Sequence, residues 1–384
     1  MAQPSPYTPG TVARTVPGRG QQLAFYEERA QYIATLESFS ARIRVDFAAR
    51  GVGKTSLLRE AERIFSRYGI RAVWVTADQD ENLTQSVLSE IRKLASPSTR
   101  RGKTLREAID SATVTINAAF AQASVTMKRP QQASEPAAKA FMRAVSTASD
   151  AVIDSGGQGF VILVDEMQSA DKPSLRAIAN AWQELQSAPV PPRAGLFGVG
   201  LPGSQDWINA AVTFSERFDF VELDGIDAAG AAEALKRAAQ DVGVTWDIDA
   251  VRLGVDSAEG YPYKVQLIGE AAWVAAGYPD PGGRISALDV QAGMSDVDRQ
   301  MQTLFQARWR NCSRKQRDLL HAIAQLGGRD VKREDIASQL GVHTSRISMA
   351  RDGLLRKGIV DASRHGRLSF TVPGFTDYIR ERAD

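Results

Sequence analysis

The sequence predicts an α/β protein: a parallel sheet comes first, a helical region follows, and a basic module ends the chain. Three observations support this prediction. Short β-branched runs alternate with long helical stretches up to about residue 223, strand signals then disappear, and basic residues exceed acidic ones towards the end. An alternation of strands and helices is typical of βαβ units, whose strands lie parallel. The length of 384 residues suits two to three domains of roughly 150 residues each.

Five apolar runs are predicted to form the sheet, which is a usual number of strands. They are residues 42–48, 71–77, 160–164, 195–199 and 218–223. The core built on these strands is expected to span residues 23–225, with a basic insertion at about 97–146. The preceding segment is rich in proline and glycine and poor in large apolar residues, so we expect a flexible tail at residues 1–22.

The insertion is too long to be a simple connection inside a compact domain. It carries a net charge of +5, and small or polar residues alternate with apolar ones around Val114, Ile116 and Phe120. This alternation predicts a β-hairpin. A solvated surface loop is the favoured interpretation of the charge, and a contact with nucleic acid or with a protein partner is the alternative.

Residues 226–306 are predicted to form a helical lid. The helical segments expected there are 228–242, 248–258, 263–276 and 289–308. The lid is followed by a terminal module at residues 307–384, which is basic although the whole chain carries a net charge of only +2. Basic residues exceed acidic ones by seven over residues 308–384. Positive potential is therefore concentrated on the terminal module, where it would attract a polyanion.

The terminal module is predicted to be a winged helix-turn-helix. Its expected helices are 314–325, 333–340 and 344–357, and its expected strands are 359–362 and 368–372. Ser345, Arg346 and Ser348 on the third helix are candidates for contacts with base edges of duplex DNA, whereas Arg364 and Arg367 at the wing tip would contact phosphates. Such modules also dock proteins, which remains the alternative.

Residues 43–56 run from a strand through a glycine-containing loop into an amphipathic helix, which is the context that a phosphate-binding loop (P-loop) requires. Glycines allow the backbone to turn its N–H groups inward, and the helix N-terminus adds partial positive charge. Lys54 would reach the β- and γ-phosphates of ATP, and the Thr55 hydroxyl would ligate Mg²⁺. The first glycine of the motif is replaced by Ala48. The predicted ATP-binding residues are Arg50, Gly51, Val52, Gly53, Lys54, Thr55 and Ser56.

The run FVILVDE at residues 160–166 is an apolar strand that ends in two carboxylates. A continuous apolar run is typical of a strand buried on both faces of a parallel sheet. Asp165 is predicted to hold Mg²⁺, and Glu166 to orient or deprotonate the attacking water. With Lys54 and Thr55, these residues predict an ATP-hydrolysing site with Lys54 and Glu166 in the catalytic group.

The motifs RGVGKTS and FVILVDE and the helical lid resemble those of the AAA+ ATPases, in particular the origin-recognition and other initiator-like ATPases. The resemblance covers nearly the whole chain. It implies an ATPase whose nucleotide state controls self-association and binding of duplex DNA. The sequence Pro17-Gly18-Arg19 resembles the N-terminal motif that packs near adenine in such proteins.

The resemblance also implies three sensing positions. Val199 and Gly200 stand where the family presents a polar sensor after the fourth strand, so Ser204 is the candidate substitute. Arg217 precedes the last strand, where the family often places an arginine that completes a neighbouring subunit's site; a surface arginine capping the strand is the alternative. Lys264 lies at the start of the helix that usually carries the second sensor, an arginine, and is predicted to contact nucleotide.

The leading hypothesis is therefore a Mg²⁺-dependent ATPase, slow or stimulated by assembly, that binds duplex DNA through its terminal winged helix. A signalling ATPase of the STAND kind, which uses the winged helix to dock a protein, is the alternative. Ala48 and the missing polar sensor leave a protein that binds ATP but barely hydrolyses it as a third option. A single cysteine, no signal peptide and no long apolar run predict a cytoplasmic protein without a membrane partner.

Overall fold

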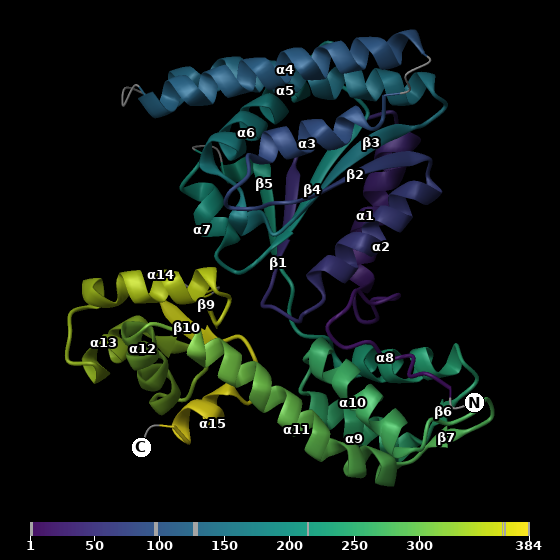
Figure 1. The fold of residues 1–384 in the computed structure, drawn as a ribbon, viewed down its shortest axis with the longest axis vertical. Helices are drawn as coiled ribbons and strands as arrows, with labels where there is room; N and C mark the ends of the chain where they lie inside the picture. The colour runs from purple at the N-terminus through teal and green to yellow at the C-terminus, as the bar shows by residue number, and fades with distance from the viewer. Residues whose placement is uncertain are drawn as a thin grey trace.

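The computed structural model describes residues 3–95, 99–125, 130–212, 215–362, 364 and 366–382, without the side chains of residues 122–135 and 215. The chain folds into a sheet-containing core, a helical lid and a terminal module (Figure 1). The lid and the terminal module lie side by side below the core in this view, and the end of strand β1 points towards their junction. Within the described residues, no helix is both long enough and apolar enough to cross a membrane.

The core is built on a five-stranded parallel sheet with the strand order β2-β3-β4-β1-β5. The strands are β1 Ile43–Phe47, β2 Ile70–Thr76, β3 Gly159–Asp165, β4 Ala194–Gly200 and β5 Phe218–Glu222. The five predicted runs are therefore confirmed, with ends that differ by at most one residue. Because the strands are parallel, their carboxyl ends meet at one edge of the sheet. Thr76 at the end of β2 pairs with Asp165 at the end of β3, so the predicted acidic strand end lies at that edge. Near the end of β1, Asp46 pairs with Val199 of β4.

Helices cover both faces of the sheet because the central strands are apolar on both sides. In β3, Val161 and Leu163 join one buried cluster, whereas Ile162 and Val164 join the other. The first cluster includes residues of α1 Gly20–Ala34 and α2 Lys54–Arg67. The second includes residues of α3 Leu83–Arg92 and α6 Lys172–Gln186. Between β4 and β5 lie the short α7 Ser204–Asn209 and the 3₁₀ turn η2 Ser215–Arg217, and the 3₁₀ turn η1 Met167–Ser169 follows β3.

The insertion forms two long helices, α4 Arg100–Val125 and α5 Pro130–Asp154, rather than the predicted β-hairpin. They lie side by side at the top of the molecule, and residues 126–129 between them are outside the described residues (Figure 1). The buried residues of α4 are spaced by three or four: Leu105, Ile109, Ala112, Ile116 and Ala119. That spacing places them on one face of a helix. Burial of this face against α5 outweighs the short local alternation that predicted a hairpin.

The N-terminal segment is packed against the lid, which differs from the expected flexible tail. The ring of Tyr7 is buried at 1% exposure, and its hydroxyl donates a 2.5 Å hydrogen bond to the Leu235 carbonyl. Trp246 donates a hydrogen bond to the same hydroxyl, and Trp273 donates one to the Gln3 carbonyl. The buried Tyr7 ring and the hydrogen bond to Gln3 thus anchor a segment whose composition predicts disorder.

The lid contains α8 Ala228–Gln240, α9 Ile248–Ala258, α10 Pro262–Ala275 and the first part of α11 Ala287–Arg310. All four predicted helices are present, and the structure adds a small parallel sheet of β6 Thr245–Trp246 and β7 Arg284–Ile285. Helix α11 crosses the predicted lid boundary at residue 306 without a break. Its residue Phe305 packs against Phe375 and Tyr378 of the terminal module, with ring centroids 5.4 Å apart in both pairs. The two parts therefore share a helix.

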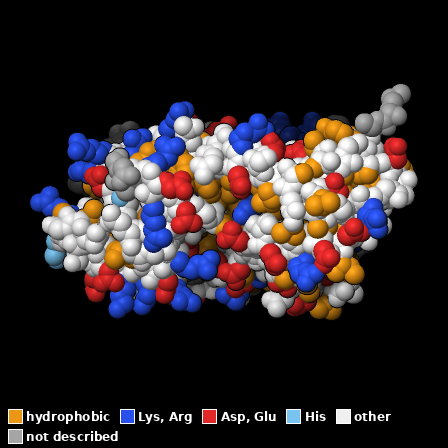
Figure 2. All heavy atoms as spheres, turned by 90° about the horizontal axis from the view of Figure 1, so that it is seen from below, with side chains coloured by type: hydrophobic (Ala, Val, Ile, Leu, Met, Phe, Trp, Pro, Cys, Tyr) orange, Lys and Arg blue, Asp and Glu red, His pale blue; other side chains and the backbone are white. Residues whose placement is uncertain are grey.

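Within its described residues, the terminal module has three successive helical segments, a further helix at its end and a three-stranded antiparallel sheet. Its helical segments are α12 Arg314–Gln325, α13 Arg333–Gln339, η3 Thr344–Ile347 with α14 Ser348–Arg356, and a final α15 Phe375–Arg380. The strands β8 Val331–Lys332, β10 Arg367–Phe370 and β9 Val360–Asp361 are adjacent in that order; β8 and α15 were not predicted. Residues 363 and 365 of the predicted wing tip are outside the described residues. In the view from below, Figure 2 shows many Lys and Arg side chains over the terminal module on the left and hydrophobic side chains over the lid on the right.

Candidate nucleotide-binding and hydrolysis site

The predicted P-loop follows β1 at the carboxyl edge of the sheet. The Ala48 amide donates to the Gly200 carbonyl at 3.0 Å, which fixes the start of the loop. Gly51 and Gly53 adopt left-handed backbone angles, with φ of +85° and +94°. A Cβ atom on Gly51 would lie 2.3 Å from the Tyr261 hydroxyl oxygen, so this position has no room for a side chain. Glycine is therefore required at Gly51 for conformation and for space.

Ala48 is accommodated where the motif usually has glycine. Among the described residues, positive φ outside glycine occurs at Glu37, Glu166, Glu259, Tyr278 and Asp330, and Ala48 is not one of them. Its methyl group is buried at 3% exposure in the cluster beneath the loop. The first position of the motif therefore needs no glycine in this chain.

Lys54, Thr55 and Asp165 meet as the sequence predicted. The Lys54 ammonium donates to the Ala49 carbonyl at 2.9 Å, and the Thr55 hydroxyl donates to an Asp165 carboxylate oxygen at 2.8 Å. Burial lowers the pKa of Lys54 to about 8, and the nearby carboxylates of Glu166 and Asp165 oppose that shift. Burial also raises the pKa of Asp165. Both charged groups are thus held in a poorly solvated position, where an ionic ligand interacts strongly with them.

Glu166 follows Asp165 in a left-handed conformation with φ of 57°, and its amide donates to the Asp165 carboxylate at 2.9 Å. Its own carboxylate accepts a hydrogen bond from the Gln168 side chain. The side-chain oxygen Oε1 of Gln168 in turn accepts a hydrogen bond from the Leu201 backbone amide at 2.8 Å, just beyond the end of β4. Gln168 therefore links the Glu166 carboxylate to the loop after β4, a contact that its sequence context did not indicate.

Ser204, the predicted substitute for the polar sensor, does not line the nucleotide cavity. Its hydroxyl donates to the Leu201 carbonyl at 2.6 Å and lies 3.5 Å from the Gln168 side-chain oxygen. The side chain is fully buried. Ser204 stabilises the loop that Gln168 contacts, and the structure gives it no direct path to a phosphate.

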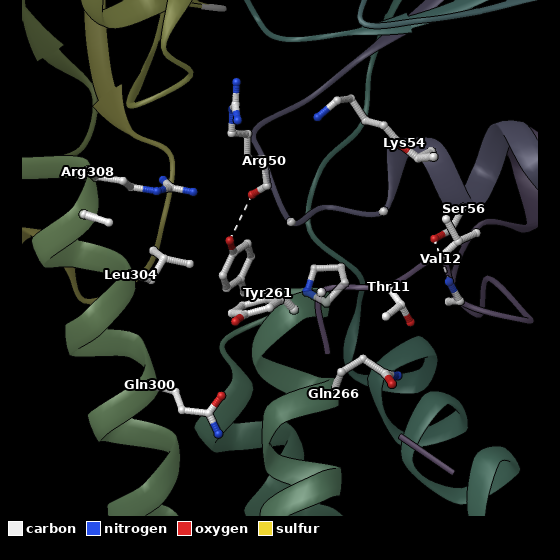
Figure 3. Close-up of a pocket in the computed structure, with 18 of the residues that line it drawn as sticks. Thr11, Val12, Arg50, Lys54, Ser56, Tyr261, Gln266, Gln300, Leu304 and Arg308 are labelled. Carbon is white, nitrogen blue, oxygen red and sulfur yellow. Dashed lines mark hydrogen bonds between the residues drawn. The ribbon is translucent and has the colours of Figure 1, made fainter. Parts of the chain in front are cut away.

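A cavity of about 1070 Å³ lies over the P-loop and is lined by residues of the N-terminal segment, the core, the lid and the terminal module. The N-terminal segment contributes Thr8 to Ala13, and the Ala13 amide donates to the Ser56 hydroxyl at 3.0 Å. Tyr261 at the start of α10 donates to the Arg50 carbonyl at 2.9 Å (Figure 3). The opposite wall is formed by α11 and the terminal module, including Gln300, Leu304, Arg308, Arg356, Lys357 and Ile359.

The charge of this cavity is strongly positive. Five cationic side chains line it, and Glu166 is the one acid among the lining residues. The cationic residues are Arg50, Lys54, Arg308, Arg356 and Lys357. Three of these five come from α11 and the terminal module, and none of the three was assigned to the nucleotide site from the sequence. The cavity therefore suits a polyanion more strongly than the P-loop alone would.

Two predicted contacts lie elsewhere in this conformation. The Lys264 ammonium forms an ion pair with Glu259 at 3.0 Å and does not line the cavity, because Tyr261 and Gln266 of the same region face it instead. The Arg217 guanidinium donates to the Gln186 side chain at 3.1 Å. Its predicted action on a neighbouring subunit is not tested by a single chain and stays a prediction.

Arg19 of the Pro17-Gly18-Arg19 sequence holds the P-loop in place. Its guanidinium donates to the carbonyls of Val52 at 3.1 Å and Asp224 at 2.8 Å. The residue is buried at 5% exposure, and burial lowers its pKa. Arg19 thus ties the loop to the segment that leads from β5 into the lid.

The predicted DNA-contact residues differ in their exposure and in their intramolecular contacts. Ser345 and Arg346 are exposed at η3, but the Ser348 hydroxyl is half-buried and accepts a 2.6 Å hydrogen bond from Arg333. Arg364 and Arg367 form ion pairs with Asp330 at 3.3 and 2.9 Å. Ser345 and Arg346 are exposed to solvent, although the Ser345 hydroxyl lies within hydrogen-bond distance of His343 at 2.9 Å, and the other three residues contact Arg333 or Asp330.

Comparison with known proteins agrees with this geometry. Residues 47–193 match the family described as AAA ATPase domain, and residues 302–379 match a domain of unknown function (DUF8462). The ORC2 protein of Aeropyrum pernix, solved in ADPNP and ADP complexes, is 15% identical with a TM-score of 0.56, and the alignment covers 96% of each chain. The Walker-type ATPase PABY2304 of Pyrococcus abyssi is 15% identical with a TM-score of 0.59, covering 97% of this chain and 98% of the other. No curated protein matches the chain.

The core is therefore an AAA-type P-loop ATPase domain. Over almost its whole length, the chain has the fold of these two structures, and the family match of residues 47–193 agrees with the predicted AAA+ P-loop fold.

Proposed function

We propose that this protein is a Mg²⁺-dependent ATPase whose nucleotide state controls its assembly and its binding of duplex DNA through the terminal module. One observation carries the enzymatic part: Lys54, Thr55, Asp165 and Glu166 converge at a single, strongly cationic cavity beside the P-loop. ATP is the substrate, and ADP and phosphate are the products.

The residues at the site fit a magnesium ion. The Thr55 hydroxyl and the Asp165 carboxylate are 2.8 Å apart, and both offer the oxygen ligands that Mg²⁺ prefers. When bound, the ion neutralises phosphate charge that develops during transfer. Lys54 and the P-loop amides hold the β- and γ-phosphates. Glu166 orients the attacking water, and Gln168 fixes the direction of the Glu166 carboxylate through their hydrogen bond.

Two substitutions test the site. Lys54→Ala is expected to abolish measurable nucleotide binding, because the buried ammonium contributes the strongest phosphate contact of the loop. Glu166→Gln is expected to retain binding and to lose turnover, measured as released phosphate. Arg310→Ala, an exposed change on α11, is the matched control and should leave both properties within twofold of wild type. Nucleotide binding by Lys54→Ala at wild-type affinity would contradict the proposal.

DNA binding is proposed for the terminal module, which supplies an excess of seven basic residues and exposes Ser345 and Arg346 at the start of its third helical segment. Its three helical segments and antiparallel strands support the winged-helix interpretation. Arg346→Ala should weaken binding of duplex DNA and reduce the slope of affinity against salt by about one unit of released cation. Arg299→Ala, an exposed arginine of the lid, provides the control; an equal loss for both variants would exclude a specific role for the module.

Assembly dependence is proposed through Arg217. The expected result is that turnover per chain rises with protein concentration and that Arg217→Ala removes this rise. An arginine that completes a neighbouring site can be worth about 10³ to 10⁵ in rate. Mixing Arg217→Ala with Lys54→Ala chains provides the decisive control, because a shared site would combine an intact P-loop with an intact Arg217 and restore activity.

A signalling switch is the second candidate, and one observation favours it. Arg364 and Arg367 are paired with Asp330, and they share a cavity of about 390 Å³ with Glu222 and Asp224 of the core. In this conformation the predicted wing therefore faces the ATPase core. A filter-binding assay of duplex DNA with and without ATP separates the two functions, since absence of DNA affinity in both states would favour signalling.

A further inference from the structure

Arg308 occupies an unusual electrostatic position in the nucleotide cavity. It extends from the last turn of α11 towards Arg50 and Tyr261 (Figure 3). Its hydrogen-bond partners are neutral: Thr371, at 3.3 Å, and the Tyr261 hydroxyl. In the part of the chain that the structure describes, no ion pair joins Arg308 to a carboxylate. The side chain is nevertheless half-buried and faces the positive charges of Arg50 and Lys54.

Burial of a guanidinium beside other cations is costly unless an anion compensates for it. A surface arginine would avoid this cost by turning into solvent, as the neighbouring Arg310 does. Arg356 and Lys357 of the terminal module line the same wall of the cavity. Lys357 donates to the Asn311 carbonyl at 2.5 Å and to the Gln316 side chain at 2.8 Å, so its ammonium is fixed next to α11. The arrangement is suited to the charge of a nucleotide's phosphates.

The same side of the terminal module touches the core. An added Cβ on Gly358 would lie 3.0 Å from a methyl carbon of Leu201, and one on Gly203 would lie 3.8 Å from Leu355. Leu201 and Gly203 belong to the loop after β4, whose amide at Leu201 is bound by Gln168. Leu201 therefore lies beside Gly358 of the module and is also hydrogen-bonded to Gln168. Gln168 in turn donates the hydrogen bond that positions Glu166.

We propose that Arg308, assisted by Arg356, binds the distal phosphates of the nucleotide and thereby holds the terminal module against the loop of residues 201–204. This inference rests on the proposed ATPase function and assigns a regulatory step to it. Phosphates bound between Lys54 and Arg308 bridge the P-loop and the module, because the two cations belong to the core and to the helix shared with the module. Loss of the terminal phosphate weakens the bridge, so the module is released more readily after hydrolysis.

The first test is nucleotide affinity. Loss of a charge-assisted contact of this kind should weaken binding of a non-hydrolysable ATP analogue by about 10- to 100-fold in Arg308→Ala. ADP binding should be weakened less. Arg310→Ala, two residues along the same helix, is the matched control and should bind both nucleotides as wild type does. Equal affinities of Arg308→Ala and Arg310→Ala for the ATP analogue would overturn the proposal.

The second test measures the docking itself by hydrogen exchange. Saturating ATP analogue should slow exchange at the amides of residues 201–204 and 355–359 in wild type, and it should fail to do so in Arg308→Ala even when the P-loop is saturated. Arg308→Lys retains a positive charge and should recover part of the protection, which also guards against a folding defect in the alanine variant. Full protection in folded Arg308→Ala would refute the bridge. If wild type binds no nucleotide, the proposed ATPase function itself fails, which is a different outcome.

Discussion

Nucleotide affinity is expected to depend on pH through Lys54. Burial brings the pKa of this ammonium down to about 8, with Arg50 and Arg308 adding to the shift and Glu166 and Asp165 opposing it. Below that pH the side chain is charged in the free protein and ready to bind phosphate. Above it the side chain is neutral, and binding must first recover a proton from solution. Affinity should therefore fall as pH rises through this value.

The size of the effect follows from the fraction of protein that carries the proton. With a pKa of about 8 in the free protein, the protonated fraction falls about tenfold between pH 7 and pH 9, which equals about 1.4 kcal/mol of binding free energy. A phosphate group loses its second proton at a pKa of about 6, so the ligand contributes little over this range. At pH 8, binding should take up about half a proton per nucleotide.

Isothermal titration of ADP at pH 7, 8 and 9, in buffers with different ionisation enthalpies, measures both affinity and proton uptake. Lys54→Arg is the control, because its guanidinium stays charged throughout this range. Its affinity should be lower than that of wild type but independent of pH. A flat wild-type profile, or an equal fall in the arginine variant, would refute the assignment of the titration to Lys54.

Three further predictions concern Gln168, Tyr7 and Ala48. Gln168→Ala should lower phosphate release by about tenfold while ADP affinity stays within twofold, because Glu166 loses the group that orients it; unchanged turnover would contradict this role. Tyr7→Ala should reduce the free energy of unfolding by about 3 to 5 kcal/mol, seen in denaturant titration, since a fully packed ring is removed; a loss below about 1 kcal/mol would indicate that the N-terminal segment does not anchor the lid. Ala48→Gly should leave nucleotide affinity unchanged and cost about 0.5 to 1 kcal/mol of stability, because the site does not use a positive φ; tighter nucleotide binding would show that the alanine distorts the loop.

The sheet and the chemical centre could be predicted because their signals are local. A strand buried on both faces must be apolar over its whole length, and the run before Asp165 shows this directly. The P-loop needs glycine where the backbone turns, which fixes Gly51 and Gly53 in the sequence. The pairing of Thr55 with Asp165 then followed from parallel strands, since their carboxyl ends share one edge of the sheet.

Local signals were misleading where burial was decided by packing against another element. The alternation around Ile116 predicted a hairpin, but packing along the whole of α4 against α5 made the segment helical. The composition of the N-terminal segment predicted disorder, yet the lid provides a pocket for Tyr7 between Trp246 and Trp273. The deciding partner lies outside the local window in both cases: α5 is the next helix along the chain, and the lid residues that hold Tyr7 are more than two hundred residues away.

The sequence by itself determined the strands, the phosphate-binding loop and the acidic pair, because each depends on residues that are neighbours in the chain. Only the tertiary structure placed Arg308, Arg356 and Lys357 over that loop and connected Gln168 to Leu201. The reason is physical: the electrostatic field in a cavity is set by charges that are close in space, and the end of α11 and the end of α14 bring these charges there from more than two hundred residues along the chain.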